Sequence, residues 1–402
     1  MNLPALPVLH AGLRKITERL AHELAEPTAA APDWSDFEWQ LAKAVAAMHG
    51  VSPLLATNLQ WDGPPGWKSF LTTQREHVAG RHRRIVELLD RLDTRAREEG
   101  IALVGLKGTA LHRLGFYRAG ERPMADIDLL VHPEQSESAA EVLESLGYSV
   151  APTLEMWKHK LFMPKRHEVH NSMGEHSQNF LKIELHERIA EALPLSRHDV
   201  TPSVYPRSPH PGLNGYPSTA ALLTHLLIHA AGAMAYRALR LMHLHDIALV
   251  AARMSEADWT ELLGSRSLKW WAFPPLILVN RYYKAAVPIS LLAVLSDRCK
   301  WHLRRAASQQ TLSDVSLSYL WIEAFPGITW SQSLSEAAQC IKSRVMPDAT
   351  LRRLRKAAAQ SEVAVANSEW GHLSQRQRIL RWLLSRRARP YTMHAVQSAF
   401  ND

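Results

Sequence analysis

Two acidic residues interrupt an apolar run in the middle of the chain. The run reads D-I-D-L-L-V and begins at Asp126. Aspartate disfavours strands, and a buried carboxylate is costly unless it is paired. Side chains at i and i+2 of a strand share a face, so Asp126 and Asp128 would project together, opposite Ile127 and Leu129. Such a pair needs a cation, or one of the acids keeps its proton.

The paired acids favour a hard divalent cation. Mg²⁺ prefers oxygen ligands and retains waters that phosphate oxygens can replace, which suits phosphoryl or nucleotidyl transfer. Glu184, between Ile183 and Leu185, is the best candidate for a third carboxylate. We predict Asp126, Asp128 and Glu184 as catalytic metal ligands, with Mg²⁺ as the ion and Mn²⁺ as its alternative. The competing interpretation of D-I-D is a salt-bridged or helix-capping loop.

A glycine turn precedes the acidic run. The stretch G-L-K-G-T begins at Gly105, after the apolar run I-A-L-V, and leads into a short helical pattern. A turn between a strand and a helix exposes N–H groups that attract anions, and a lysine adds a point charge. We predict that Gly105, Lys107, Gly108 and Thr109 face the phosphates of an NTP. Arg122 would support them by bidentate contact, or would only neutralise the acids.

The order of these motifs resembles the nucleotidyltransferase superfamily typified by DNA polymerase beta. It is more closely similar to the bacterial family of uncharacterised nucleotidyltransferases, whose core reads L-K-G, then Arg, then D-I-D-L-L-V, then a strand with an acid and a histidine. Here these parts are residues 106–108, Arg122, 126–131 and 183–186. The similarity extends over about 35–250.

The resemblance implies a small sheet flanked by helices, with Mg²⁺ held by Asp126, Asp128 and Glu184. It also implies that an acceptor hydroxyl attacks the α-phosphate of an NTP and that pyrophosphate leaves. Two features depart from the superfamily pattern. The turn usually carries Gly-Ser, whereas this chain has Lys107-Gly108, and the third acid is Glu where Asp is common. The acceptor stays open, since the superfamily modifies RNA ends, antibiotics, proteins and small metabolites.

Histidines offer alternative chemistry. The chain has 21 of them, and His245-Asp246 resembles the dipeptide of HD-type metal phosphohydrolases. His186 shares a strand face with Glu184 and would orient it, act as a base, or be structural. His229 and Asp246 are predicted as accessory residues that line the cleft opposite the acids. A catalytically inactive nucleotide- or RNA-binding module is the third alternative.

Periodicity divides the chain into three regions. Residues 1–95 read as helices, with Ser35 as N-cap and Glu38 as its capping-box partner. Residues 96–205 alternate short strands and helices, and 213–402 are helical throughout. We therefore predict an α+β protein: a nucleotidyltransferase-like mixed sheet core, a helical N-terminal segment and a large all-helical C-terminal region.

The charge of the chain is uneven. The net charge is +8, and residues 291–402 alone hold 16 Lys and Arg against 8 Asp and Glu. Six arginines lie between Arg376 and Arg389 without an acid. This basic run indicates either an anionic acceptor such as RNA or a solvated helical face.

Composition bears on the cellular compartment of the protein. The two cysteines, Cys299 and Cys340, make no metal-type spacing and no disulfide framework. No apolar stretch is long enough to span a membrane, and the first residues lack a basic start and a cleavage site. We expect a cytoplasmic protein with no membrane partner.

Overall fold

The chain forms a six-stranded mixed sheet, as seen in a computed structural model that describes residues 3–151, 159–166, 170, 173–265, 268–349 and 372–401. The strand order is β3-β4-β5-β2-β1-β8. The bounds are β1 Ala102–Gly105, β2 Asp126–Val131, β3 Tyr148–Val150, β4 His159–Pro164, β5 Lys182–His186 and β8 Gly212–Asn214. The predicted α+β class is confirmed.

The acidic run is strand β2, in the middle of this sheet. It pairs antiparallel with β1 and parallel with β5, which places Asp128 opposite Glu184 and Leu130 opposite His186. β4 pairs antiparallel with β5, so His159 lies opposite His186. The strand prediction is confirmed, and the alternative interpretation of D-I-D as a loop is wrong.

Two strands of the sheet were not predicted. β4 lies in an interval that reads as polar and rich in histidine. β8 begins at Gly212, between the predicted regions 96–205 and 213–402, and pairs parallel with β1. The sheet therefore takes its last strand from the segment where the helical C-terminal region was expected to begin.

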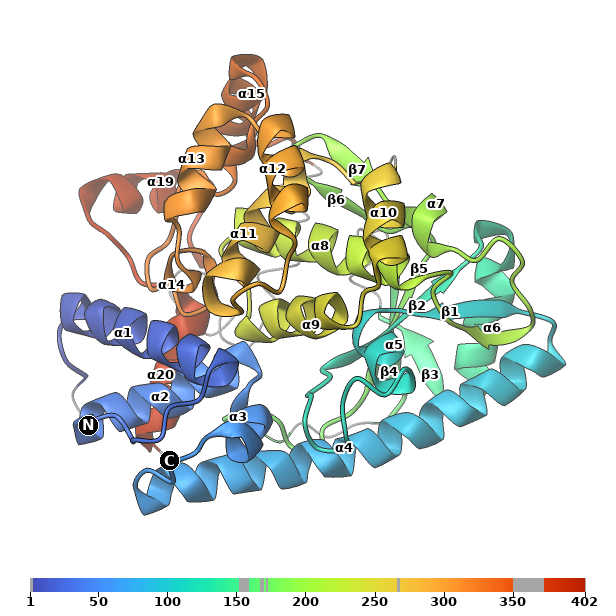
Figure 1. The fold of residues 1–402 in the computed structure, drawn as a ribbon, viewed down its shortest axis with the longest axis horizontal. Coiled ribbons are helices and arrows are strands. Elements are labelled where there is room, and N and C mark those ends of the chain that lie inside the picture. The colour runs from blue at the N-terminus through green and yellow to red at the C-terminus, as the bar shows by residue number, and fades with distance from the viewer. Residues whose placement is uncertain are drawn as a thin grey trace.

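Four helices precede the sheet: α1 Leu6–Ala25, α2 Asp36–His49, α3 Ser52–Asn58 and α4 Pro65–Glu98. The predicted capping box of α2 is confirmed, because Ser35 and Glu38 bond reciprocally and Gly50 ends the helix with φ +69°. α4, with 34 residues, is the longest of the described helices. It runs along one side of the molecule from the N-terminal helices to the far end of the sheet (Figure 1).

Helices dominate the rest of the described chain. Within the core they are α5 Lys107–Arg113, α6 Ser136–Ser145 and α7 Thr201–Val204, beside a small hairpin of β6 Ala190–Ala192 and β7 Arg197–Asp199. The C-terminal helices are α8 Thr219–Ala235, α9 Leu241–Ala252, α10 Glu256–Gly264, α11 Phe273–Tyr282, α12 Ile289–Arg298, α13 Trp301–Gln309, α14 Leu312–Val315, α15 Leu334–Val345, α19 Gln375–Leu384 and α20 Pro390–Asn401. In the part of the chain that the structure describes, no helix combines the length and apolarity needed to cross a membrane.

The two faces of β2 join different apolar cores. Ile127, Leu129 and Val131 pack in one cluster with residues of α4 and α6. Leu130 belongs to a second, larger cluster formed by the N-terminal helices and by α8, α9 and α11. Asp126 and Asp128 share the face of Leu130 because of the two-residue period, so the acids face the helical C-terminal region.

Candidate active site

Three carboxylates share one face of two neighbouring strands. Asp126 and Asp128 lie on β2, and the parallel register sets Glu184 of β5 beside Asp128. Burial raises the pKa of Asp126 to about 6, with further contributions from the charges of Asp128 and Glu184. The three predicted acids therefore interact electrostatically across the two strands.

Asp128 already has two cationic or proton-bearing partners. Lys107 Nζ lies 2.9 Å from its Oδ1, and His186 Nε2 donates to the same oxygen at 3.1 Å. Burial would raise the pKa of Asp128, but the Lys107 charge and the His186 hydrogen bond outweigh burial and hold it well below its usual range. The pKa of Lys107 is raised, since the attraction of Asp128 and Asp126 exceeds the cost of its burial. Asp128 is thus charged, and its Oδ1 is already bonded to Lys107 and His186.

Asp126 has no such partner. None of the described residues donates a hydrogen bond to its carboxylate, although Asp128 and Glu184 add negative charge nearby. A carboxylate in this position is stabilised by a bound cation. The oxygen donors of Asp126, Asp128 and Glu184 fit a hard divalent ion in chemical type.

The glycine turn brings Lys107 to the acids. Lys107 has φ +42°, a left-handed conformation that residues with a Cβ adopt at a cost, and its N–H donates to Tyr216 Oη at 3.1 Å. A Cβ on Gly108 would meet Arg122 Nη1 at 2.3 Å, so only glycine allows this approach. The N–H of Thr109 bonds Leu106 O at 2.9 Å. The turn therefore offers mainly the Lys107 ammonium, because the N–H groups of Leu106, Lys107 and Thr109 are engaged within the protein.

A cavity of about 850 Å³ opens in front of the acids. Of the residues predicted to face phosphates, Lys107, Gly108 and Arg122 line it, whereas Gly105 does not, and Thr109 is buried behind the turn. Asp126 and Asp128 line it as well. Its volume falls within the range of small-molecule sites.

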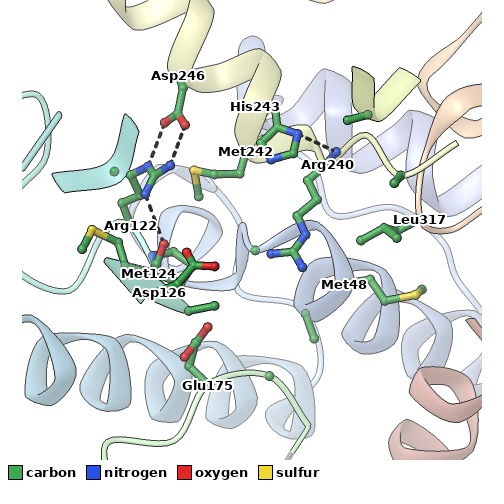
Figure 2. Close-up of a pocket in the computed structure, with 18 of the residues that line it drawn as sticks. Met48, Arg122, Met124, Asp126, Glu175, Arg240, Met242, His243, Asp246 and Leu317 are labelled. Atoms are coloured by element: carbon green, nitrogen blue, oxygen red, sulfur yellow. Dashed lines mark hydrogen bonds and ion pairs between the residues drawn. The ribbon is translucent and has the colours of Figure 1, made fainter. Parts of the chain in front are cut away.

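Arg240 is a cavity residue that sequence reasoning missed. Its guanidinium points into the cavity that also contains Asp126 and Glu175 (Figure 2). Its positive charge lowers the pKa of Asp126, though less than burial and the other acids raise it. Among the described residues, none accepts a hydrogen bond from this guanidinium. Arg240 is the N-cap of α9, in the stretch L-R-L-M-H. The signal in the sequence was an arginine directly before a helix.

Arg122 is bound to the helical region. Its Nε and Nη2 donate to the two carboxylate oxygens of Asp246 on α9 at 2.9 and 2.7 Å, and Tyr117 Oη donates to Asp246 at 2.6 Å. Both charged groups are buried, Asp246 being 1% exposed. The bidentate contact of Arg122 is therefore made with Asp246. Its predicted contact with a triphosphate stays a prediction.

The histidines predicted as accessory residues occupy different settings. His229 lines the cavity and packs edge-to-face on His243, with ring centroids 4.9 Å apart; burial lowers the pKa of both. In the HD dipeptide, Asp246 is paired with Arg122, and His245 Nδ1 lies 3.0 Å from Tyr283 Oη. Within the described ranges, the one group of three metal-ligating side chains is His159, Glu184 and His186. This group contains neither His245 nor Asp246, so the HD-type alternative gains no support from it. Of the three predicted acids it contains Glu184 but not Asp126 or Asp128.

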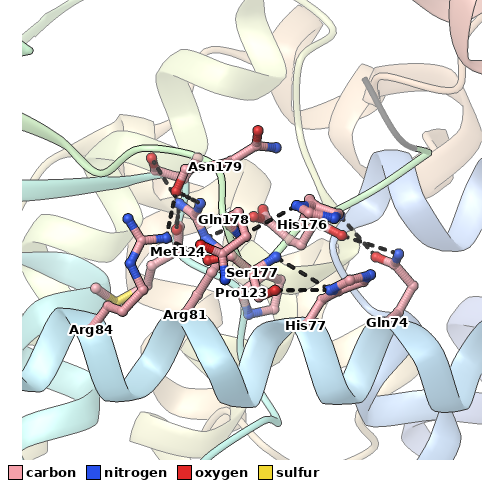
Figure 3. Close-up of polar contacts among 12 residues, drawn as sticks. Gln74, His77, Arg81, Arg84, Pro123, Met124, His176, Ser177, Gln178 and Asn179 are labelled. Carbon is pink, nitrogen blue, oxygen red and sulfur yellow. Dashed lines mark hydrogen bonds and ion pairs between the residues drawn. The ribbon is translucent and has the colours of Figure 1, made fainter. Parts of the chain in front are cut away.

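A loop held by α4 forms one wall of the cavity. Gln74 Nε2 donates to Met173 O at 3.0 Å, and Arg81 Nε pairs with Glu175 Oε2 at 3.0 Å (Figure 3). Arg81 Nη2 also donates to Met124 O at 2.9 Å, next to Asp126. The long helix thus fixes both the loop of Met173 to Asn179 and the segment that leads into β2.

The basic C-terminal run does not form one free cationic face. Arg389 Nη1 donates to Arg237 O at 2.7 Å and to Ser316 O at 3.2 Å, and Arg386 lies over the Trp321 ring at 5.9 Å. Residues 350–371, which carry four more basic residues, lie outside the described residues. The predicted RNA surface stays a prediction.

Comparison with known families decides the classification. The model of a family described as uncharacterised nucleotidyltransferase matches residues 35–288, more than half of the chain. The chain belongs to this nucleotidyltransferase family. Searches of curated proteins and of solved structures found no match.

The matched region contains every predicted site residue. It runs from the N-cap of α2 through α11 and includes the acids, the glycine turn, Arg122 and Arg240. The resemblance inferred from the sequence motifs is confirmed at the level of the family. Residues beyond 288, including α20 at the cavity rim, lie outside the match.

Glu184 has a different setting from the other two acids of the candidate site. It does not line the main cavity, and its Oε2 lies 3.5 Å from both His159 Nε2 and His186 Nε2. Burial would raise the pKa of Glu184, but the hydrogen bond from His186 and the charge of His159 contribute to lowering it. His159 was not predicted from the sequence, because its strand β4 was not recognised.

Proposed function

We propose that this protein is an Mg²⁺-dependent nucleotidyltransferase that transfers an NMP from an NTP to an acceptor hydroxyl. The observation that carries the proposal is Asp126: a largely buried carboxylate at the cavity, beside two further acids, without a donor among the described residues. Mg²⁺ would be held by Asp126, Asp128 and Glu184 and would neutralise charge on the phosphates.

The cations around the acids support a phosphate-binding role. Lys107 lies at the turn, and Arg240 enters from α9 on the other side of the cavity. Both neighbour the carboxylates, and their positive charges lower the pKa of Asp126 by less than burial and the other acids raise it. We assign Lys107 and Arg240 to the triphosphate, and Gly108 to the close approach of the turn. Arg122 would support them from its pair with Asp246.

In the proposed reaction the acceptor oxygen forms a bond to the α-phosphorus. The bond from that phosphorus to the bridging oxygen of the β-phosphate breaks, and pyrophosphate leaves with the electron pair. The hydroxyl proton passes to a base, for which Glu184 is the candidate. His186 holds Glu184 and Asp128 in place through its Nε2.

The acceptor is left open at the level of chemical class, with RNA as one candidate because of the basic C-terminal region. The test incubates the full chain with each α-³²P-labelled NTP, Mg²⁺ and cell extract, and then separates RNA, protein and small molecules. We expect label in one fraction with the parent protein and none with Asp126→Asn or Asp128→Asn. Equal labelling by these variants would refute the site. A parent that binds Mg²⁺ and NTP but labels nothing would favour the inactive binding module.

A further inference from the structure

Three side chains next to the acid pair form a group with a different ligand chemistry. His159 of β4 and His186 of β5 are direct partners in the antiparallel register, and Glu184 lies two residues before His186. The period of two places all three on the face that carries Asp126 and Asp128. One potential ligand atom from each residue lies within 4.8 Å of the other two.

The distances suit a shared ion. Glu184 Oε2 is 3.5 Å from His159 Nε2 and 3.5 Å from His186 Nε2. Two ligand atoms that each lie about 2.1 Å from a tetrahedral ion are about 3.4 Å apart. The two imidazole rings are 4.7 Å apart between centroids, so they can converge on one point without a change of strand register.

The three side chains of this group are partly exposed to solvent. The side chains of His159, Glu184 and His186 are 21%, 23% and 13% exposed. Asp128 Oδ1 lies 3.1 Å from His186 Nε2, which gives the group a carboxylate neighbour shared with the acid pair. An ion could therefore enter from solvent and reach a fourth protein oxygen.

We propose that His159, His186 and Glu184 form a second metal site that takes a borderline divalent ion such as Zn²⁺ or Co²⁺. Imidazole nitrogen suits these ions, whereas Mg²⁺ prefers oxygen and retains its waters. The inference deepens the proposed function, because it rests on Glu184 lying beside the acid pair and adds a site of different ion preference. Asp128 would lie between the two sites.

The alternative account is that His186 is a structural histidine. Its Nε2 proton would then satisfy Asp128 and Glu184, and His159 would only pack beside it. This account predicts that removing His159 has no effect on metal binding. The two accounts differ in a measurement that needs no substrate.

The test titrates the metal-free full chain with Co²⁺ and follows its visible absorption, which reports nitrogen ligation and coordination number. We expect one Co²⁺ per chain, displaced by Zn²⁺ but not by a large excess of Mg²⁺. His159→Ala should weaken Co²⁺ binding at least about tenfold, and His186→Ala should abolish it. His132→Ala, which removes an exposed histidine directly after β2, is the matched control and should bind as the parent does.

A comparison of Asp126→Asn with His159→Ala separates this proposal from the proposed function. Asp126→Asn should lose Mg²⁺-dependent NTP binding and keep the Co²⁺ spectrum, and His159→Ala should do the reverse. Circular dichroism and thermal unfolding check that each variant folds, and His159→Gln replaces His159→Ala if the latter does not. Unchanged Co²⁺ affinity in a folded His159 variant, or no Co²⁺ binding by the parent, would overturn the second site.

Discussion

Two groups of buried charges lie within this molecule and behave differently. At the junction of the core with α9, Arg122 and Asp246 form a bidentate pair that Tyr117 completes, so each charge has a partner. On the sheet face, Asp128 pairs with Lys107, whereas Asp126 has no donor among the described residues. A satisfied buried pair fixes architecture, whereas an unsatisfied carboxylate beside a cavity indicates a ligand.

The largest effect on stability should come from breaking the junction. Asp246→Ala leaves the Arg122 charge buried without a partner, and we expect a loss of about 3 to 5 kcal/mol in the free energy of unfolding. Denaturant titration measures it. Asp62→Ala, which removes an exposed pair with Lys68, is the control and should cost less than about 1 kcal/mol. Adding Arg122→Met to Asp246→Ala should recover part of the loss; an unchanged midpoint for Asp246→Ala would contradict the role of the pair.

At the acid pair, a substitution should mainly lower the rate of nucleotide transfer. Asp128→Asn removes a charge that Lys107 and His186 both engage. We expect nucleotide transfer to fall at least about 100-fold, the scale of one lost electrostatic contact to a transition state. The initial rate of label transfer measures this change. Glu137→Gln, an exposed acid on α6, should keep the parent rate, and a Asp128→Asn rate within threefold of the parent would break the comparison.

Gly108 joins the two groups, and its substitution should affect both. A Cβ there would meet Arg122 Nη1 at 2.3 Å and Met124 Sδ at 2.9 Å. We expect Gly108→Ala to cost about 1 to 3 kcal/mol in stability, as overpacking does. Gly215→Ala is the matched control, because nothing lies within 4 Å of its added Cβ. Equal unfolding midpoints for the two variants would show that the turn has room.

The smallest predicted effect is a gain in stability, whereas the preceding substitutions lower stability or activity. Asp126 has its pKa raised from 3.8 to about 6 by burial and by the other acids, so the folded state binds more protons and the metal-free protein loses stability as pH rises through this window. Above this pH window, Asp126→Asn should stabilise the metal-free protein by on the order of 1 to 2 kcal/mol. A shift of one pKa unit corresponds to about 1.4 kcal/mol. Part of that gain is lost because Asn is still a buried polar group. Below the window the difference should vanish. Thermal unfolding at several pH values measures it, and a destabilised variant at high pH would be the contrary result.

Much of this comparison could be predicted from local sequence. The alternation around Asp126 and Glu184 indicated the two strands, and the box of Ser35 and Glu38 indicated the start of α2. Local patterns also placed the glycine turn before the acids. These features depend on residues within a few positions of one another.

The rest depends on contacts that are distant in the chain. Arg122 meets Asp246 across 124 positions, and no local pattern reports that the arginine is already paired. His159 reaches the site only through β4, whose residues are partly buried on both faces and show no clear alternation. Arg240 enters the cavity because α8 and α9 pack over the acidic face, which is a property of the helical region as a whole.

The most direct test of the central claim compares thermal unfolding of the parent and Asp126→Asn at pH 8, with and without Mg²⁺ and NTP. The account predicts that the metal-free parent unfolds at a lower temperature than the variant. Mg²⁺ with NTP should then raise the midpoint of the parent and leave the variant unchanged. A parent midpoint that does not respond, or an equal rise in both proteins, would contradict a metal-dependent nucleotide site at Asp126.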